Sequence, residues 1–249
     1  MELQDILYSQ GFGTRRVCAG LVQQGWVQVY DGSAAEQPVP CTDSTSEWPL
    51  DGLRLRVQGV DWECHAKAYL LLHKPAGTEC SQKPSTYPSV YSLLPVPLRQ
   101  RPSKSAVQGV QAIGRLDQDT TGLLLMSDDG QFIHRMASPK KHVPKVYRVT
   151  TKHPVDAAQI AQLLAGVVLD DDPKPVRAAA CELLEPHQID LTLTEGKYHQ
   201  VKRMLAAVGN RVEGLHRWRM GRYDLPADLA PGQWRWLTAD DLQRLVAKD

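Results

Sequence analysis

The sequence lacks closely spaced cysteines and long apolar runs. Its five cysteines are never closer than sixteen residues, and no CxxC pair occurs. This spacing excludes the common structural zinc patterns, so reduced thiols in a cytoplasm are expected. No apolar run reaches the roughly eighteen residues of a membrane span, and the acidic start MELQD is unlike a signal peptide. These absences predict a soluble, cytoplasmic chain, and without heptads or an obvious apolar patch we expect a monomer.

Charge is distributed unevenly although the net charge is only +1. Residues 1–60 hold four Lys/Arg against seven Asp/Glu, whereas residues 195–224 hold seven against three. Two further segments carry basic residues without acids: Arg135, Lys140, Lys141, Lys145, Arg148 and Lys152 in the first, and Arg99, Arg101 and Lys104 in the second. A solvated face would explain any one cluster. Three clusters together favour a polyanionic partner, which makes nucleic acid a candidate.

The 249 residues are enough for one sizeable domain and a small one. In residues 1–60, Thr14 can cap a helix that runs to about Gln24 and ends at Gly25, before a strand at 26–30. The pattern GxxTRRxxxxLVxxGxVxV resembles the S-four-type RNA-binding module, and this resemblance implies that Arg15 and Arg16 face RNA phosphates. The acidic balance leaves a second interpretation open, in which the module serves only as a scaffold.

The sequence pattern of residues 61–249 predicts a second domain, in which strands and helices mix without βαβ regularity. Strands are expected at 69–73, 123–126, 145–151 and 188–194. Helices are expected after Asp156 up to Gly166, and at 199–208. This order predicts an α+β fold with a largely antiparallel sheet and flanking helices.

The segment GRLDQDTTG (114–122) precedes an apolar strand and carries two acids. Taken alone, it permits three interpretations. Asp117 could be a catalytic carboxylate, the acids could serve turns, or both could join two later acids to hold a hard metal ion. The metal interpretation needs Asp117, Asp119, Asp128 and Asp129.

Two later segments favour the catalytic interpretation. Tyr147 lies among basic residues on a predicted strand, where it could stack an unpaired base or, taken alone, simply be a half-buried strand tyrosine. In the helix expected at 199–208, the helical repeat puts the apolar side chains on one face. Lys202 lies at the edge of this face, and Arg203 points nearly opposite. Burial favours the neutral form of a carboxyl group, so a catalytic aspartate needs a cation such as Lys202. The residues expected on the apolar face are Tyr198, Val201, Met204, Leu205 and Val208.

In this order, the motifs GRLDxxTxGLLLxxxDG, SPxxxxxKxY and EGxYHQVKRMxxAVGN resemble the pseudouridine synthases of the RsuA type. Lys74-Pro75-x-Gly77 and Leu215-His216-Arg217 extend the resemblance, which covers about residues 66–240. It implies the pseudouridine-synthase fold and conversion of one uridine, of the uridine-516 type, to pseudouridine in 16S ribosomal RNA or a small-subunit assembly particle. A 23S substrate or a non-catalytic ribosome-assembly factor remain alternatives.

The resemblance also implies roles for individual residues, without cofactor or metal. Asp117 is the expected nucleophile or base, Tyr147 stacks on the target base, and Lys202 pairs with the aspartate. Expected contacts to RNA are made by basic residues of both domains: Arg15, Arg16, Arg115, Lys140, Lys141, Lys145, Arg203 and Arg217.

Overall fold

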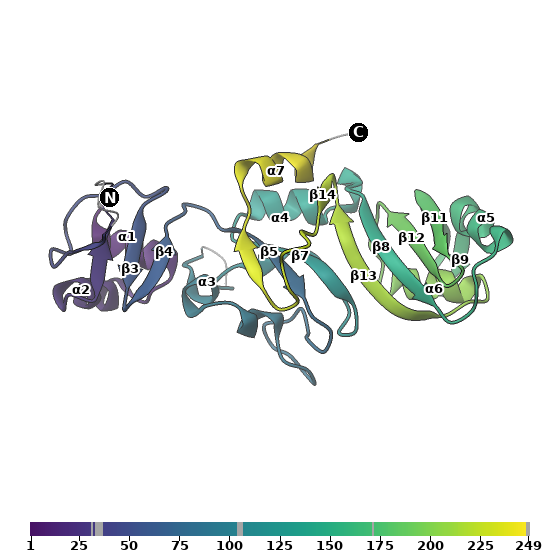
Figure 1. Cartoon of the computed structure of the whole chain (residues 1–249), viewed down its shortest axis with the longest axis horizontal. Helices are drawn as coiled ribbons and strands as arrows, with labels where there is room; N and C mark the ends of the chain where they lie inside the picture. Colours follow the sequence, from purple (N-terminus) through teal and green to yellow (C-terminus); the bar gives the residue numbers. More distant parts are fainter. Residues whose placement is uncertain (31, 33–36, 104–106, 171, 248–249) are drawn as a thin grey trace. The chain divides into compact units, whose positions relative to one another are not determined.

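The computed structural model describes residues 1–249 except 31, 33–36, 104–106, 171 and 248–249 (Figure 1). The chain forms two compact units. The first comprises Met1–Tyr69, Leu94–Gln111 and Ser127–Asp129, and the second comprises Leu70–Leu93, Ala112–Met126 and Gly130–Asp249. The division predicted at residues 60–61, into an RNA-binding module and a catalytic domain, stays a prediction.

The first unit contains three helices and a four-stranded sheet of order β2-β1-β3-β4. Helix α2 begins as predicted, because the Thr14 side chain accepts a hydrogen bond from the Val17 amide, and Gly25 follows its end at a φ of 74°. Leu3, Ile6 and Leu55 are fully buried. The elements are α1 (Leu3–Gln10), α2 (Arg15–Gln23), β1 (Val27–Val29), β2 (Val39–Pro40), β3 (Arg54–Val57), β4 (Val60–Glu63) and α3 (Val96–Gln100).

Arg101 lies in the interior of the first unit, with only 2% of the residue exposed. Its Nε donates to Asp128 Oδ2 at 2.6 Å, and Nη1 donates to Gln10 Oε1 at 3.0 Å. Nη2 donates to the carbonyl oxygens of His65 and Ala66. The predicted Arg99–Lys104 phosphate cluster is therefore wrong for Arg101, whose donors are already satisfied inside the protein. Lys104 lies outside the described residues.

Replacement of Arg101 by Met is expected to destabilise the protein by about 3–5 kcal/mol, because it leaves the Asp128 carboxylate buried without its cation. Urea denaturation measures this loss. Arg99→Met is the matched control, since Arg99 is exposed and such surface changes stay within about 0.5 kcal/mol. Equal stability of the two variants would contradict the proposed role of Arg101.

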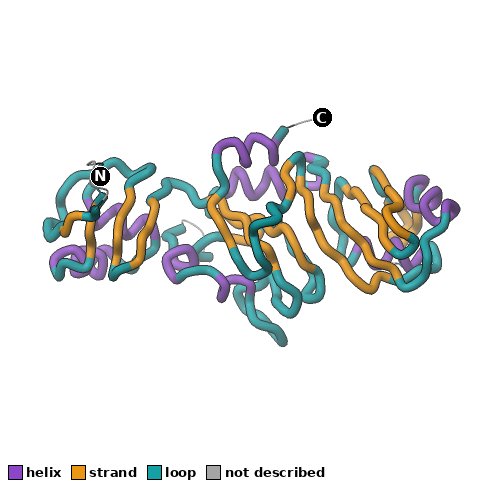
Figure 2. The backbone as a smooth tube through the Cα atoms, viewed as in Figure 1, coloured by secondary structure: helices purple, strands orange, loops and turns teal. Residues whose placement is uncertain are grey.

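A nine-stranded sheet organises the second unit, with the order β11-β12-β8-β13-β7-β5-β15, while β14 pairs with β13 and β6 with β7. Strand β8 lies antiparallel to both β12 and β13, whereas β13 and β7 are parallel. Figure 2 shows these strands side by side. The strands are β5 (Tyr69–Lys74), β6 (Gln111–Ala112), β7 (Thr121–Ser127), β8 (Lys145–Thr151), β11 (Ala180–Glu185), β12 (Gln188–Leu193), β13 (Val212–Met220), β14 (Tyr223–Asp224) and β15 (Trp234–Trp236).

Local sequence signals set the helices of this unit. Asp156 and Gln159 form a capping box at the start of α5, which ends before Gly166 as predicted. Helices α5 and α6 lie at the β11–β12 end of the sheet (Figure 1), and Leu163 and Leu205 are buried in the same apolar cluster as Leu191. The remaining elements are α4 (Gly130–Ala137), α5 (Ala157–Ala165), α6 (Gln200–Ala207), α7 (Ala239–Val246), β9 (Val167–Leu169) and β10 (Asp172–Val176), with 3-10 turns η1 (Val90–Leu93) and η2 (Pro139–Lys141).

The predicted α+β class with a largely antiparallel sheet is confirmed. Among the described residues, no helix is both long and apolar enough to cross a membrane.

Candidate active site

The loop that carries Asp117 is fixed by Lys74, the last residue of β5. Lys74 is fully buried, and its Nζ donates to the carbonyl oxygens of Thr120 at 2.8 Å and Gln118 at 3.3 Å. The Thr120 amide in turn donates to the Asp117 carbonyl at 3.1 Å. Burial lowers the pKa of Lys74, and the surrounding carbonyl oxygens satisfy its ammonium group. The Lys-Pro-x-Gly motif therefore holds the backbone on which Asp117 is presented.

Gly122 allows β7 to approach β13 at the end of this loop. Its φ is 109°, and a Cβ at this position would lie 2.2 Å from the Arg217 carbonyl oxygen. Any other residue would strain the backbone and clash with β13. The last glycine of GRLDQDTTG is thus required by close packing of two strands.

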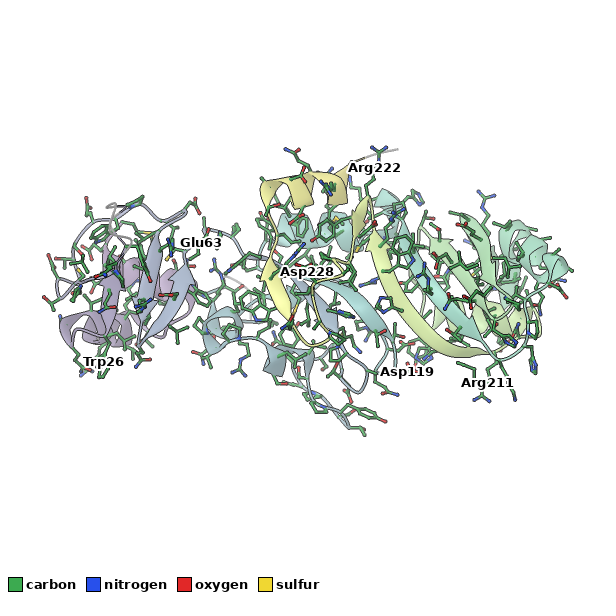
Figure 3. The ribbon with its side chains drawn as sticks, in the orientation of Figure 1. Trp26, Glu63, Asp119, Arg211, Arg222 and Asp228 are labelled. Carbon is green, nitrogen blue, oxygen red and sulfur yellow. The ribbon has the colours of Figure 1, made fainter. Side chains whose placement is uncertain are left out.

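Both oxygens of the Asp117 carboxylate face a nitrogen from the start of α6. Lys202 Nζ lies 3.1 Å from Oδ2, and His199 Nε2 lies 3.3 Å from Oδ1. Lys202 also donates to both oxygens of Asp119, at 2.7 and 2.9 Å; Asp119 is labelled in Figure 3. The predicted proximity of Lys202 to Asp117 is present, but the same ammonium group also binds a second carboxylate.

Burial and hydrogen bonding have opposite effects on the charge states of Lys202 and Asp119. Burial lowers the pKa of Lys202, but its hydrogen bonds with Asp119 and Asp117 outweigh burial and raise it. For Asp119, burial favours the neutral form, but the hydrogen bond from Lys202 prevails and lowers the pKa of the carboxyl group. At neutral pH the lysine is therefore charged and Asp119 is ionised.

His199 was not assigned a role from the sequence, and it stands at the start of α6. It has a φ of 48° and is the N-cap of α6, so the helix begins one residue later than predicted. Tyr198 lies outside the helix and is 70% exposed. Its ring stacks on the His199 ring, with 3.8 Å between the ring centres. The expected place of Tyr198 on the buried helix face is wrong, because the left-handed turn at His199 breaks the helical repeat. Val201, Met204, Leu205 and Val208 are buried as expected.

Asp117, Lys202 and Tyr147 line one cavity of about 700 Å³, together with Arg115, Leu116 and His199. Tyr147 lies on β8 directly opposite Arg217 of β13, and the guanidinium carbon is 6.0 Å from its ring centre. The volume is in the range of sites that enclose a small organic ligand. The structure thus brings the three predicted catalytic residues to one cavity.

The predicted RNA-binding residues fall into different environments. Arg115 is exposed where it lines the cavity, and Arg203 is half-buried on α6, where it donates to the Tyr198 carbonyl. Lys145 and Arg217 line the inside of the cavity rather than an outer face, because both lie on central strands of the sheet. In the first unit, Arg16 is exposed, whereas Arg15 forms an ion pair with Asp5 at 2.8 Å.

Lys140 and Lys141 line a second groove of about 940 Å³, together with His134, Arg135 and His142. All five side chains are exposed. Arg148, counted with this basic segment in the sequence, instead forms a two-point ion pair with Asp190, so its charge is neutralised within the sheet.

The metal interpretation required Asp128 and Asp129 to join Asp117 and Asp119. Asp128 instead accepts from Arg101, and Asp129 accepts from Tyr69 at 2.7 Å. Both acids belong to the first unit. The described part of the chain contains no group of three or more His, Cys, Asp or Glu side chains that could hold an ion.

A family model and individual relatives point to the same protein family. The family model described as RNA pseudouridylate synthase matches residues 68–207. The ribosomal small subunit pseudouridine synthase A of Pasteurella multocida is 37% identical over 242 residues, 97% of this chain and 98% of the relative. The protein of the same name from Salmonella typhimurium is 44% identical over 238 residues, 96% of this chain and 97% of the relative.

The fold agrees with this sequence similarity. A crystal structure of a pseudouridylate synthase superimposes with a TM-score of 0.67 at 32% identity, over 99% of this chain and 100% of the other. The resemblance inferred from the three motifs is thereby confirmed, and the chain belongs to the RNA pseudouridylate synthase family of isomerases.

Proposed function

We propose that this protein converts one uridine of small-subunit (16S) ribosomal RNA, at a site of the uridine-516 type, to pseudouridine, with Asp117 as the catalytic carboxylate. The observation that carries the proposal is the pairing of Asp117 with Lys202 at 3.1 Å in the cavity that also contains Tyr147. The names of the relatives support the small-subunit substrate. With ribosomal RNA as substrate, the proposed place of action is the cytoplasm.

The proposed chemistry needs a carboxylate that stays ionised near the sugar. Lys202 and His199 place positive or hydrogen-bonding groups at both oxygens of Asp117, and the side chain keeps 26% of its surface exposed. Asp117 then either attacks C1′ of the ribose or removes the C2′ proton, and both routes release the base. Lys202 is the proposed partner that holds the carboxylate in its reactive form.

RNA recognition is proposed to use basic residues other than Lys202 and His199, which pair with Asp117. Arg115 and Arg203 are placed to contact phosphates near the cavity, and Lys140 and Lys141 to contact phosphates along the second groove. Arg15 and Arg16 are the proposed contacts of the first unit, where the ion pair with Asp5 competes for Arg15. Such contacts release counterions and make binding salt-dependent.

Tyr147→Phe is expected to retain most activity, whereas Tyr147→Ala is expected to lose about 10- to 100-fold in kcat/KM. The reason is that the ring is proposed to stack on the flipped uracil, an interaction worth about 1–3 kcal/mol per base. Kinetics on one RNA with both variants measure the difference. An equal loss in Phe and Ala would instead make the hydroxyl group the important part of Tyr147.

The substrate is tested by mapping pseudouridine after incubation with unmodified 16S RNA, unmodified 23S RNA and a 16S assembly particle. Carbodiimide modification followed by primer extension marks each pseudouridine as a stop. A single new stop in 16S RNA supports the proposal. A stop only in 23S RNA would overturn the substrate, and no stop in any RNA would favour a non-catalytic assembly factor.

A further inference from the structure

The charges of the cavity are balanced on one side only. Around Asp117, two carboxylates face Lys202 and His199. On the sheet side, Lys145 and Arg217 form no ion pair with any carboxylate of the described residues. Lys145 Nζ donates to the Val143 carbonyl at 3.0 Å, and Arg217 Nε donates to the Leu123 carbonyl at 2.8 Å. Nη2 of Arg217 is buried and has no hydrogen-bond partner.

Strand pairing places these two cations beside Tyr147. Lys145 and Tyr147 are two residues apart on β8, so both side chains point to the same face of the sheet. Arg217 is the partner of Tyr147 across the antiparallel pair with β13. The aromatic ring proposed to stack on the uracil is therefore accompanied by two positive groups.

Removing these cations from water has a cost that no protein carboxylate offsets. Arg217 is 2% exposed, and Lys145 is half-buried. Burial, and secondly the charge of Arg217, lower the pKa of Lys145 to about 8. A buried charge is normally paired with an opposite charge, whereas backbone carbonyl oxygens are the acceptors found here for Lys145 and Arg217. The substrate is the available source of the negative charge.

Two parts of the substrate can supply negative charge. The phosphates of the RNA are charged before and after the reaction. The uracil is neutral when it arrives and becomes an anion when the N1–C1′ bond breaks and the electron pair stays on the base, shared by N1, O2 and O4. Because Lys145 and Arg217 lie beside Tyr147, where the proposed function puts the ring, the base is the closer source.

We propose that Lys145 and Arg217 bind the uracil as it leaves the sugar and stabilise the negative charge on its carbonyl oxygens. The inference rests on the proposed function and adds a leaving-group site to it. The detached base then rejoins C1′ through C5; C5 loses its proton and N1 gains one, so the reaction remains a balanced isomerisation. Fixed donors that meet charge only after bond cleavage accelerate the chemical step rather than tighten binding.

Lys145→Met, which removes the charge and keeps the length, is expected to lower kcat about 100-fold and to change the Kd for RNA less than twofold. Arg115→Met is the matched control, because Arg115 is an exposed cation of the same cavity. That variant is expected to raise KM, which is the signature of a lost phosphate contact and differs from the kcat effect of Lys145→Met. Thermal melting of each variant checks that the fold is retained.

Lys145→Arg provides the second measurement, the pH dependence of kcat. Lys145 is charged below its pKa of about 8, so wild-type kcat is expected to fall as pH rises through 8. The arginine stays charged, so this alkaline fall should disappear. The other titratable or charged groups that line the cavity are unchanged in this variant, which isolates the titration of Lys145. These groups are Glu79, Cys80, Arg115, Asp117, Tyr147, Glu195, Lys197, Tyr198, His199, Lys202 and Arg217.

Three outcomes decide the inference. A Lys145→Met variant with normal kcat and raised KM would make Lys145 a phosphate contact and overturn the leaving-group role. An alkaline fall that persists unchanged in Lys145→Arg would also overturn it. Both results require an active wild type and leave the proposed function intact, whereas a wild type that forms no pseudouridine rejects the proposed function itself.

Discussion

Asp117→Asn is expected to abolish pseudouridine formation, with kcat reduced at least about 10⁴-fold, as for removal of a central catalytic group in other enzymes. The amide has the same size but can neither attack the sugar nor remove its proton. Folding is expected to persist because Lys202 retains Asp119 at 2.7 Å. Nucleoside analysis of the RNA after long incubation measures the reaction, and filter binding and thermal melting measure RNA affinity and stability.

Asp119→Asn is the matched control for this result. Asp119 binds the same lysine but is more exposed, at 53% against 26% for Asp117. We expect this variant to remain active, with a loss below about 10²-fold from weaker positioning of Lys202. Substantial turnover by Asp117→Asn, or greater damage from Asp119→Asn, would contradict the assignment of Asp117.

Lys202→Met is expected to lower kcat by about 10²- to 10³-fold, the range seen when one preorganised electrostatic contact is lost from an active site. Without the ammonium group, Asp117 loses the cation that lies 3.1 Å from its Oδ2, and Asp119 loses its hydrogen-bond donor. The pKa of Asp119, which Lys202 now lowers, should rise. Single-turnover kinetics of the wild type and Lys202→Met on the same RNA measure the loss of kcat.

Two variants separate the ion pair from the general charge of α6. Lys202→Arg keeps the positive charge and should restore part of the activity. Arg203→Met removes the neighbouring cation, which donates to the Tyr198 carbonyl, and should mainly weaken RNA binding. Equal losses of kcat in Lys202→Met and Arg203→Met would show that the ion pair with Asp117 is not the source of the effect.

Features with a local sequence signal were predictable in the fold. Thr14 and Asp156 cap their helices because a short polar side chain reaches an amide three residues ahead. The strand at 145–151 agrees with the prediction. Arg101 shows the limit of such signals. Its partners Gln10 and Asp128 are 91 and 27 residues away, so its burial depends on tertiary packing that no local pattern encodes.

In the candidate site, too, the features set by local sequence were predictable and those set by distant contacts were not. Lys202 was placed near the aspartate by the helical repeat, which holds within α6. The same repeat gave the wrong position for Tyr198, because His199 adopts a left-handed backbone conformation just before the helix. The histidine of EGKYH and the second acid of LDQD were both visible in the motifs. Their contacts with Asp117 and Lys202 depend on a loop and a helix 82 or 83 residues apart.

Tritium release from RNA labelled at C5 of uridine tests the central claim most directly, because rejoining the base through carbon removes that proton. Wild-type protein, Asp117→Asn and Asp119→Asn would each be incubated with labelled 16S RNA in excess EDTA. The account predicts release by the wild type and by Asp119→Asn, none by Asp117→Asn, and RNA of unchanged length. RNA binding by the wild type without tritium release, or release that persists in Asp117→Asn, would contradict it.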